Sequence, residues 1–131
     1  MTESDLDRDT AYMRQAIELA REAGRHGEVP VGALVVGDGG IVGRGFNSPI
    51  GESDPTAHAE MLVIQAVATS RREKRLPFAD LYVTLEPCPM CAGAIVHCRP
   101  ERVVFGCPDP KGGAAGSWIN LLEANPPLNH R

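Results

Sequence analysis

The chain has 131 residues, of which 43% are hydrophobic, and a formal net charge of −4. This length suits one domain, spanning residues 1–131, that buries roughly two thirds of its unfolded surface without disulfides. The acidic balance argues against broad, salt-driven binding of nucleic acid but is compatible with a small local contact. Because the start is acidic and polar, we expect neither a signal peptide nor a membrane span, and a cytoplasmic protein.

The first third of the chain predicts a helix followed by a β-hairpin. Apolar residues at helical spacing predict a helix that is capped by Asp9 or Thr10 and ends near Gly24 or Gly27. Two β-branched runs follow, over residues 29–36 and 41–47, and the Gly/Asp-rich segment between them is typical of a hairpin turn.

The middle of the chain predicts helices that alternate with buried strands. A proline- and glycine-rich loop over 48–56 leads to a mostly buried helix from His58 to about Arg72. A strand over 81–85 runs into a cysteine-containing helix, which the Arg99-Pro100 pair ends because proline cannot extend it.

The last part predicts one more strand and a long loop. Residues 102–106 form a buried strand, residues 108–116 a glycine- and proline-rich loop, and residues 117–124 a short helix. Strands alternating with helices after a hairpin predict an α/β layer fold, with the later strands parallel and the two motif helices on one face of the sheet.

Cys88 and Cys91 are the first candidates for chemistry. In a reducing compartment this spacing more often binds a metal or serves redox chemistry than forms a structural bridge. With His58 they supply three ligands, one fewer than a closed structural zinc site and the number typical of a catalytic one. All three open helices, where the helix dipole stabilises thiolates. Such a zinc ion can lower the pKa of a bound water to about 7.

Glu60 strengthens the catalytic interpretation of the metal motif. It follows His58 by two residues at the start of a helix, so its carboxylate can lie near the metal without ligating it. A carboxylate in that place can take a proton from water and return it to a substrate, which is general acid–base catalysis by one group.

Two other interpretations remain open at this stage. The Cys-x-x-Cys pair is also typical of half a structural zinc ribbon or of a redox pair. A structural site needs a fourth ligand, for which the candidates are Cys98, Cys107, His97 and His26. The cysteines among these are better explained as core residues, and His97 by its place near a helix C-terminus.

The order of these motifs resembles the cytidine deaminase superfamily, and within it the bacterial tRNA-specific adenosine deaminases. The resemblance runs from about Glu28 to the C-terminus. It rests on Glu-Val-Pro-Val-Gly-Ala at 28–33, Phe46-Asn47, Asp54 to Glu60, Leu81 to Ala94, Arg102 to Gly106, Asp109, Lys111, residues 113–117 and Asn129-His130.

The resemblance implies a role for each site residue. His58, Cys88 and Cys91 would hold Zn²⁺, and Glu60 would shuttle the proton. Asn47 would hydrogen-bond the edge of the base, and Asp109 would lie on a loop that faces the ribose or the nucleotide backbone. The family fold is a three-layer α/β/α arrangement around a five-stranded mixed sheet, and the family enzyme is a homodimer.

The activity implied is hydrolytic deamination of adenosine to inosine at the wobble position of tRNA, with the anticodon stem-loop as partner. The runner-up is a deaminase of a free base or nucleoside, such as guanine, cytosine or adenine. A third possibility, from a different class, is a zinc-stabilised binding module without catalysis. Replacement of Glu60 would leave every measured activity unchanged only if the protein is such a binding module.

Two features depart from the family pattern. Members usually continue past Asn-His into a further helix with aromatic and basic residues, whereas this sequence ends at Arg131, so we expect that helix to be missing. Cys98 and Cys107 replace residues that are commonly small, which we interpret as neutral core substitutions.

Overall fold

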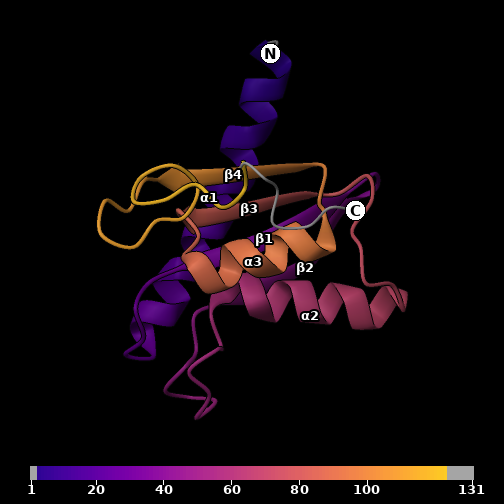
Figure 1. Ribbon diagram of the computed structural model, residues 1–131. Coiled ribbons are helices and arrows are strands. Elements are labelled where there is room, and N and C mark those ends of the chain that lie inside the picture. The colour runs from indigo at the N-terminus through magenta and orange to yellow at the C-terminus, as the bar shows by residue number, and fades with distance from the viewer. Residues whose placement is uncertain (1–2, 124–131) are drawn as a thin grey trace.

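A mixed sheet with helices on both faces organises the computed structural model, which describes residues 3–123 (Figure 1). The elements in chain order are α1 (Glu3–Arg25), β1 (Gly32–Gly37), β2 (Gly40–Phe46), α2 (Ala59–Arg71), β3 (Asp80–Leu85), α3 (Pro89–Cys98) and β4 (Arg102–Cys107). The strand order is β2-β1-β3-β4, with β1 antiparallel to β2 and β3, and β3 parallel to β4. The α/β class and the parallel pairing of the later strands are therefore confirmed.

The two faces of the sheet carry separate apolar clusters. Leu34 and Tyr82 pack with Ala16 under α1. Alternate residues of the same strands, including Val35 and Val83, pack with the α2 and α3 side of the core. Because side chains alternate along a strand, two short strands supply both clusters. As predicted, α2 and α3 lie together on one face of the sheet, with α1 on the other (Figure 1).

The helix α1 approaches β1 closely at Gly32. A Cβ atom at this position would lie 2.1 Å from the Ala16 carbonyl oxygen, far inside van der Waals contact. A residue without a side chain is therefore required where the first strand enters the sheet.

Two sequence-based predictions about element bounds are wrong. The helix α1 begins at Glu3 rather than at Asp9 or Thr10. The predicted short helix over 117–124 is absent from its described part, in which Ala115 and Asn120 instead form an isolated bridge. The Leu121 N–H, which would bond to the Ser117 carbonyl in such a helix, bonds to the Ala114 carbonyl at 2.9 Å instead.

The five-stranded sheet implied by the family resemblance is also corrected, because residues 3–123 form a sheet of four strands. The chain beyond β4 turns back against the end of β3 instead of adding a strand: the Ala114 N–H bonds to the Pro87 carbonyl at 2.8 Å. The Asn129-His130 segment and the position of any further helix lie outside the described residues.

Asp9 is a buried partner of the sheet rather than a helix cap. Only 7% of its surface is exposed. Its carboxylate accepts hydrogen bonds from the Tyr82 hydroxyl and from Arg102, with Nη2 to Oδ1 at 2.6 Å and Nη1 to Oδ2 at 3.1 Å. The hydrogen bond from Arg102 is the main cause that lowers the Asp9 pKa from its ordinary value of 3.8. This network ties α1 to β3 and β4.

We expect Asp9→Asn to lower the free energy of unfolding at pH 7 by about 1–3 kcal/mol, because Arg102 loses a charged acceptor. A carboxyl group whose pKa is lowered by folding stabilises the fold above its unfolded pKa and ceases to do so as pH falls through the folded value. The difference between the variant and the wild type should therefore shrink below about pH 4. Urea unfolding at pH 7 and pH 3 measures it, with Asp7→Asn, an exposed carboxylate on the same helix, as the control. An equal loss of unfolding free energy at pH 7 and pH 3 would contradict the role assigned to the Asp9 carboxylate.

Candidate metal centre and its pocket

The metal-ligating residues begin two helices. His58 is the N-cap of α2 and Cys88 the N-cap of α3, both with extended backbone and without a side-chain cap hydrogen bond. Their carbonyls accept the first helical bonds, from Leu62 and Ala92. The side chains are therefore free to face a shared site where the positive ends of two helix dipoles favour anionic ligands.

The donor atoms of His58, Cys88 and Cys91 all lie within 4.8 Å of one another. His58 Nδ1 is 3.6 Å from Cys88 Sγ and 3.5 Å from Cys91 Sγ. A tetrahedral zinc ion, with Zn–S distances of about 2.3 Å and Zn–N distances of about 2.0–2.1 Å, would separate sulfur from nitrogen by about 3.6 Å. The three side chains are thus already spaced as zinc requires.

The two thiols have opposite shifts in pKa. A hydrogen bond with Cys91 is the largest cause that lowers the pKa of Cys88 to about 5. The same hydrogen bond, followed by burial, raises the pKa of Cys91. Zinc binds the thiolate form, so metal binding displaces the protons that this thiol pair still holds.

None of the four candidates for a fourth ligand, Cys98, Cys107, His97 and His26, belongs to the metal-binding group of the described residues. The metal-binding group found within residues 3–123 comprises His58, Cys88 and Cys91 alone. The Cys98 thiol is buried, as predicted, and lies 3.6 Å from the Ile95 carbonyl. Cys107 is exposed, so the prediction that it is a core residue is wrong. The His26 ring stacks on Phe46. A group with three protein ligands keeps a coordination position open, as a catalytic zinc site does.

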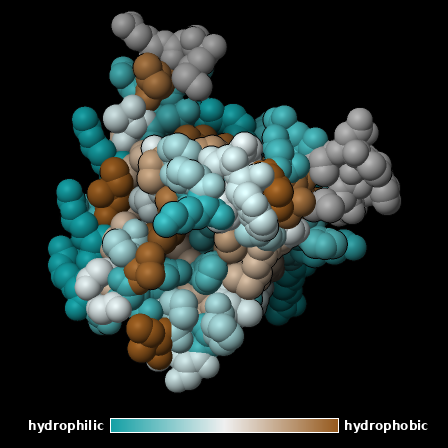
Figure 2. Space-filling model, turned by 60° about the vertical axis from the view of Figure 1, so that its left-hand side comes forward, coloured by the Kyte–Doolittle hydropathy of each residue, from teal (hydrophilic) through white to brown (hydrophobic). Residues whose placement is uncertain are grey.

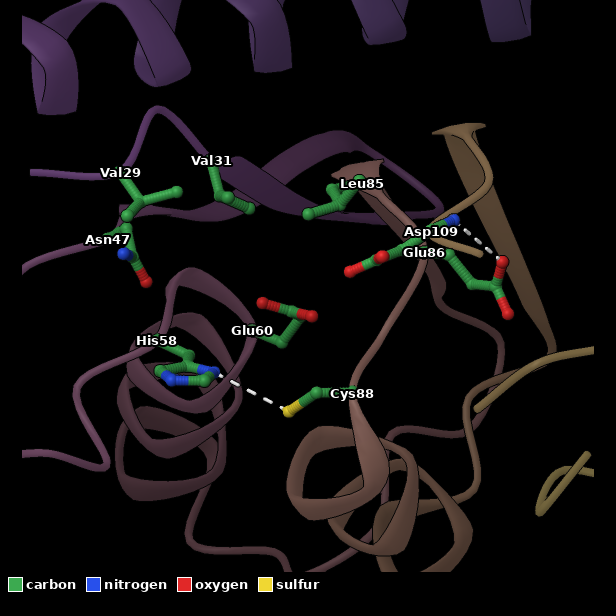
Figure 3. Close-up of a pocket in the computed structure, with 9 residues that line it drawn as sticks. All are labelled: Val29, Val31, Asn47, His58, Glu60, Leu85, Glu86, Cys88 and Asp109. Atoms are coloured by element: carbon green, nitrogen blue, oxygen red, sulfur yellow. Dashed lines mark hydrogen bonds between the residues drawn. The ribbon is translucent and has the colours of Figure 1, made fainter. Parts of the chain in front are cut away.

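A cavity of about 210 Å³ opens beside the metal-ligating group. It is lined by Val29, Val31, Asn47, His58, Glu60, Leu85, Glu86, Cys88 and Asp109 (Figure 3). This volume lies below the roughly 300–1,000 Å³ of sites for drug-sized ligands, so the cavity suits a single planar ring rather than a whole nucleotide. The valines and leucine give that ring apolar walls.

Glu60 lies inside the cavity wall with 4% of its surface exposed. Burial raises its pKa above the ordinary value of 4.5. Figure 3 shows its carboxylate above the line that joins His58 to Cys88, among the other residues that line the cavity. A carboxyl group whose proton affinity is increased by burial is suited to accept a proton and to give it back.

Asn47 and Asp109 line the cavity on opposite sides (Figure 3). Asn47 is 8% exposed and its backbone N–H bonds to the Val31 carbonyl at 2.9 Å, which leaves its amide side chain to the cavity. Asp109 has a second engagement that the sequence did not indicate: its Oδ1 accepts N–H groups from Lys111 and Gly112.

Sequence reasoning missed two buried carboxylates around the cavity. Glu28, 7% exposed, accepts the N–H groups of Ile50 and Gly51 on the loop that leads to His58. Glu86, 3% exposed, accepts hydrogen bonds from the loop that carries Asp109. Both belong to the motifs that support the family resemblance, but their partners are mainly backbone groups, which have no sequence signature.

The surface around this region has mixed character. Figure 2 shows hydrophobic residues in brown separated by hydrophilic and neutral ones, without one large apolar area.

None of the helices within residues 3–123 has the length and apolar character that crossing a membrane requires.

This fold and site define a zinc-dependent deaminase. The sequence profile of the cytidine and deoxycytidylate deaminase zinc-binding region matches residues 6–107, and the chain belongs to this family. It is 51% identical over 118 residues to the tRNA-specific adenosine deaminase of Bacillus subtilis (strain 168), an alignment that covers 90% of this chain and 73% of that protein. Identity to the Haemophilus influenzae enzyme of the same name is 50% over 116 residues, covering 88% of this chain and 67% of the relative.

Solved structures agree with this assignment. A structure from a study of A-to-I editing by tRNA:A34 deaminases superposes with a TM-score of 0.84 and 46% identity, covering 88% of both chains. Guanine deaminase from Bacillus subtilis superposes with a TM-score of 0.73 and 35% identity, covering 82% of this chain and 66% of that one.

Removing any one metal-ligating side chain should abolish stoichiometric zinc binding. We expect His58→Ala and Cys91→Ala to weaken zinc binding by more than the roughly 10–100-fold that loss of an outer-shell partner typically costs. Competition with a chromogenic chelator measures the affinity, and Cys107→Ala, an exposed cysteine outside the group, is the matched control. Wild-type affinity in either ligand variant would exclude this site.

Proposed function

We propose that the protein catalyses hydrolytic deamination of adenosine to inosine at the wobble position of tRNA. The observation that carries the proposal is the buried Glu60 carboxylate beside a three-ligand metal group, at the end of a cavity sized for one base. The similarity to tRNA-specific adenosine deaminases over 90% of the chain supports tRNA as the substrate.

We propose that Glu60 acts twice as the proton carrier. Zinc, when bound by His58, Cys88 and Cys91, would supply the Lewis-acid chemistry that activates water. The Glu60 carboxylate accepts a proton from the attacking water as its oxygen bonds to C6 of adenine, and gives it to the base. Glu60 then carries the proton of the hydroxyl group now on C6 to N6, the C6–N6 bond breaks and ammonia leaves, so that the C6 carbonyl of inosine remains.

Asn47 and Asp109 are proposed to orient the target nucleotide. The Asn47 amide can donate to and accept from the edge of a base, which is the pairing that amide side chains make with purines. We propose that Asp109, which lines the opposite side of the cavity, meets the ribose or backbone of the extruded nucleotide. The base must leave its stack to enter the cavity, and a single-stranded anticodon loop reduces that cost.

The proposed partner is the anticodon stem-loop of tRNA. We further propose that the enzyme acts in the cytoplasm as a homodimer, in keeping with the resemblance to its family. The acidic balance of the chain favours a local contact at the cavity mouth over broad electrostatic binding of RNA.

The zinc-loaded protein should convert the wobble adenosine of an anticodon stem-loop RNA to inosine. Glu60→Gln keeps the shape of the side chain but cannot cycle a proton, so we expect its rate to fall about 10²–10⁴-fold with zinc content unchanged. Inosine is measured by nuclease digestion and chromatography.

Deamination of free guanine or cytosine, with none of the RNA, would instead favour the alternative of a free-base deaminase, to which the similarity with guanine deaminase points. A Glu60→Gln variant as active as the wild type would exclude both enzymatic functions and favour a zinc-stabilised binding module.

We expect Asn47→Ala to lower kcat/KM for the stem-loop about 10–100-fold, since a good amide contact to a base contributes roughly 1–3 kcal/mol. Asn47→Asp keeps an oxygen acceptor but lacks the amide donors. If the base edge needs a donor, its kcat/KM should also fall, but by less than that of Asn47→Ala. Steady-state kinetics on the stem-loop separates these outcomes, and wild-type kcat/KM in both variants would exclude base contact by Asn47.

A further inference from the structure

Glu86 is the residue around which the 109–117 loop folds. Its Oε1 accepts the Asp109 N–H at 3.1 Å, and its Oε2 accepts the N–H groups of Ala115 at 2.9 Å and Ser117 at 3.0 Å. The Ser117 hydroxyl also donates to Oε1. One carboxylate, 3% exposed, therefore receives four donors from both ends of a single loop.

The packing around this carboxylate is close. A Cβ atom at Gly113 would lie 2.3 Å from the Glu86 carboxyl carbon, so the loop can wrap the carboxylate only where a residue lacks a side chain. The next residue, Ala114, is fully buried and its N–H bonds to the Pro87 carbonyl at 2.8 Å. The loop is thus bonded to two consecutive residues of the chain that leads into Cys88.

The direction of the Glu86 side chain separates its role from that of the cavity groups. In Figure 3 the Glu86 carboxylate points away from Glu60 and toward the loop, whereas the Asp109 carboxylate points back toward the cavity. Glu86 therefore acts on the cavity through the loop that it holds.

We infer that Glu86 is a positioning residue that fixes the 109–117 loop as one wall of the substrate cavity and thereby sets where Asp109 meets the nucleotide. The part of this inference that concerns substrate rests on the proposed function. The part that concerns the loop does not.

The test is Glu86→Gln in the intact, zinc-loaded protein. The glutamine amide nitrogen cannot accept a hydrogen bond, so up to two loop donors lose their acceptor, and KM for the stem-loop should rise about 10-fold while kcat changes little. Trp118, the single tryptophan of the chain, follows Ser117 directly, and its backbone N–H donates a hydrogen bond to the Gly113 carbonyl. Its fluorescence anisotropy should fall, because the indole gains freedom when the loop loosens.

Matched variants make the test decisive. Glu28→Gln alters a second buried carboxylate, one that holds the 50–51 segment rather than this loop, and should leave the Trp118 anisotropy at its wild-type value. Gly113→Ala perturbs the same contact from the loop side and should give the same changes in KM and anisotropy. It replaces Glu86→Gln as the test if that variant does not fold. Ser117→Ala, which removes one of the four donors, should give a smaller fall in anisotropy.

Unchanged Trp118 anisotropy and KM in Glu86→Gln would overturn the inference. Loss of zinc in proportion to activity would also overturn it, because Glu86 would then act on the metal site. If the wild-type protein does not deaminate the stem-loop, the proposed function fails, and the anisotropy measurements still decide whether Glu86 holds the loop.

Discussion

The site depends on bringing the N-termini of two helices together at one end of a sheet. The helix α2 starts at His58 and α3 at Cys88, and each start combines an extended N-cap residue with unsatisfied backbone N–H groups. The strand β3 fixes where Cys88 lies, because it sits between β1 and β4 in the middle of the sheet. The 3.5–3.6 Å spacing between imidazole nitrogen and thiol sulfurs follows from this rigid scaffold rather than from loops.

Hydrogen bonding then separates the functions of two equally buried carboxylates that line one cavity. Glu60 lies in a largely apolar wall and its pKa is raised, which suits proton transfer. Glu86, on the same cavity, has its pKa lowered to about 2, chiefly by the Ser117 hydroxyl and then by backbone N–H groups. It remains an anion that can only accept hydrogen bonds. One group is therefore suited to chemistry and the other to holding structure, although both are glutamates with almost no exposed surface.

The sequence predicted the parts that contiguous motifs encode. His58, Cys88, Cys91 and the position of Glu60 in the cavity wall follow from short spacings at helix starts, where local geometry determines which side chains share a face. Asp9 was misassigned as a helix cap because its partner Arg102 lies 93 residues further along the chain. The predicted helix after residue 116 was wrong because the Leu121 N–H bonds to the Ala114 carbonyl and Ala115 pairs with Asn120, so this segment closes a turn instead of a helix. The roles of Glu60, Asn47 and Asp109 remain predictions.

The construction of the cavity explains how one fold can serve related substrates. The metal group and Glu60 come from helix starts packed on the sheet, so the chemical end of the cavity is rigid. The rim at Asp109 belongs to a loop held by the buried carboxylate of Glu86, and the buried carboxylate of Glu28 holds the loop that leads from Asn47 to His58. A change in loop sequence can alter the cavity mouth without moving the ligands, provided that the carboxylate keeps its backbone donors. The guanine deaminase with the same fold is consistent with this separation, since discrimination between purines then belongs to the rims and the shared deamination chemistry to the helix starts.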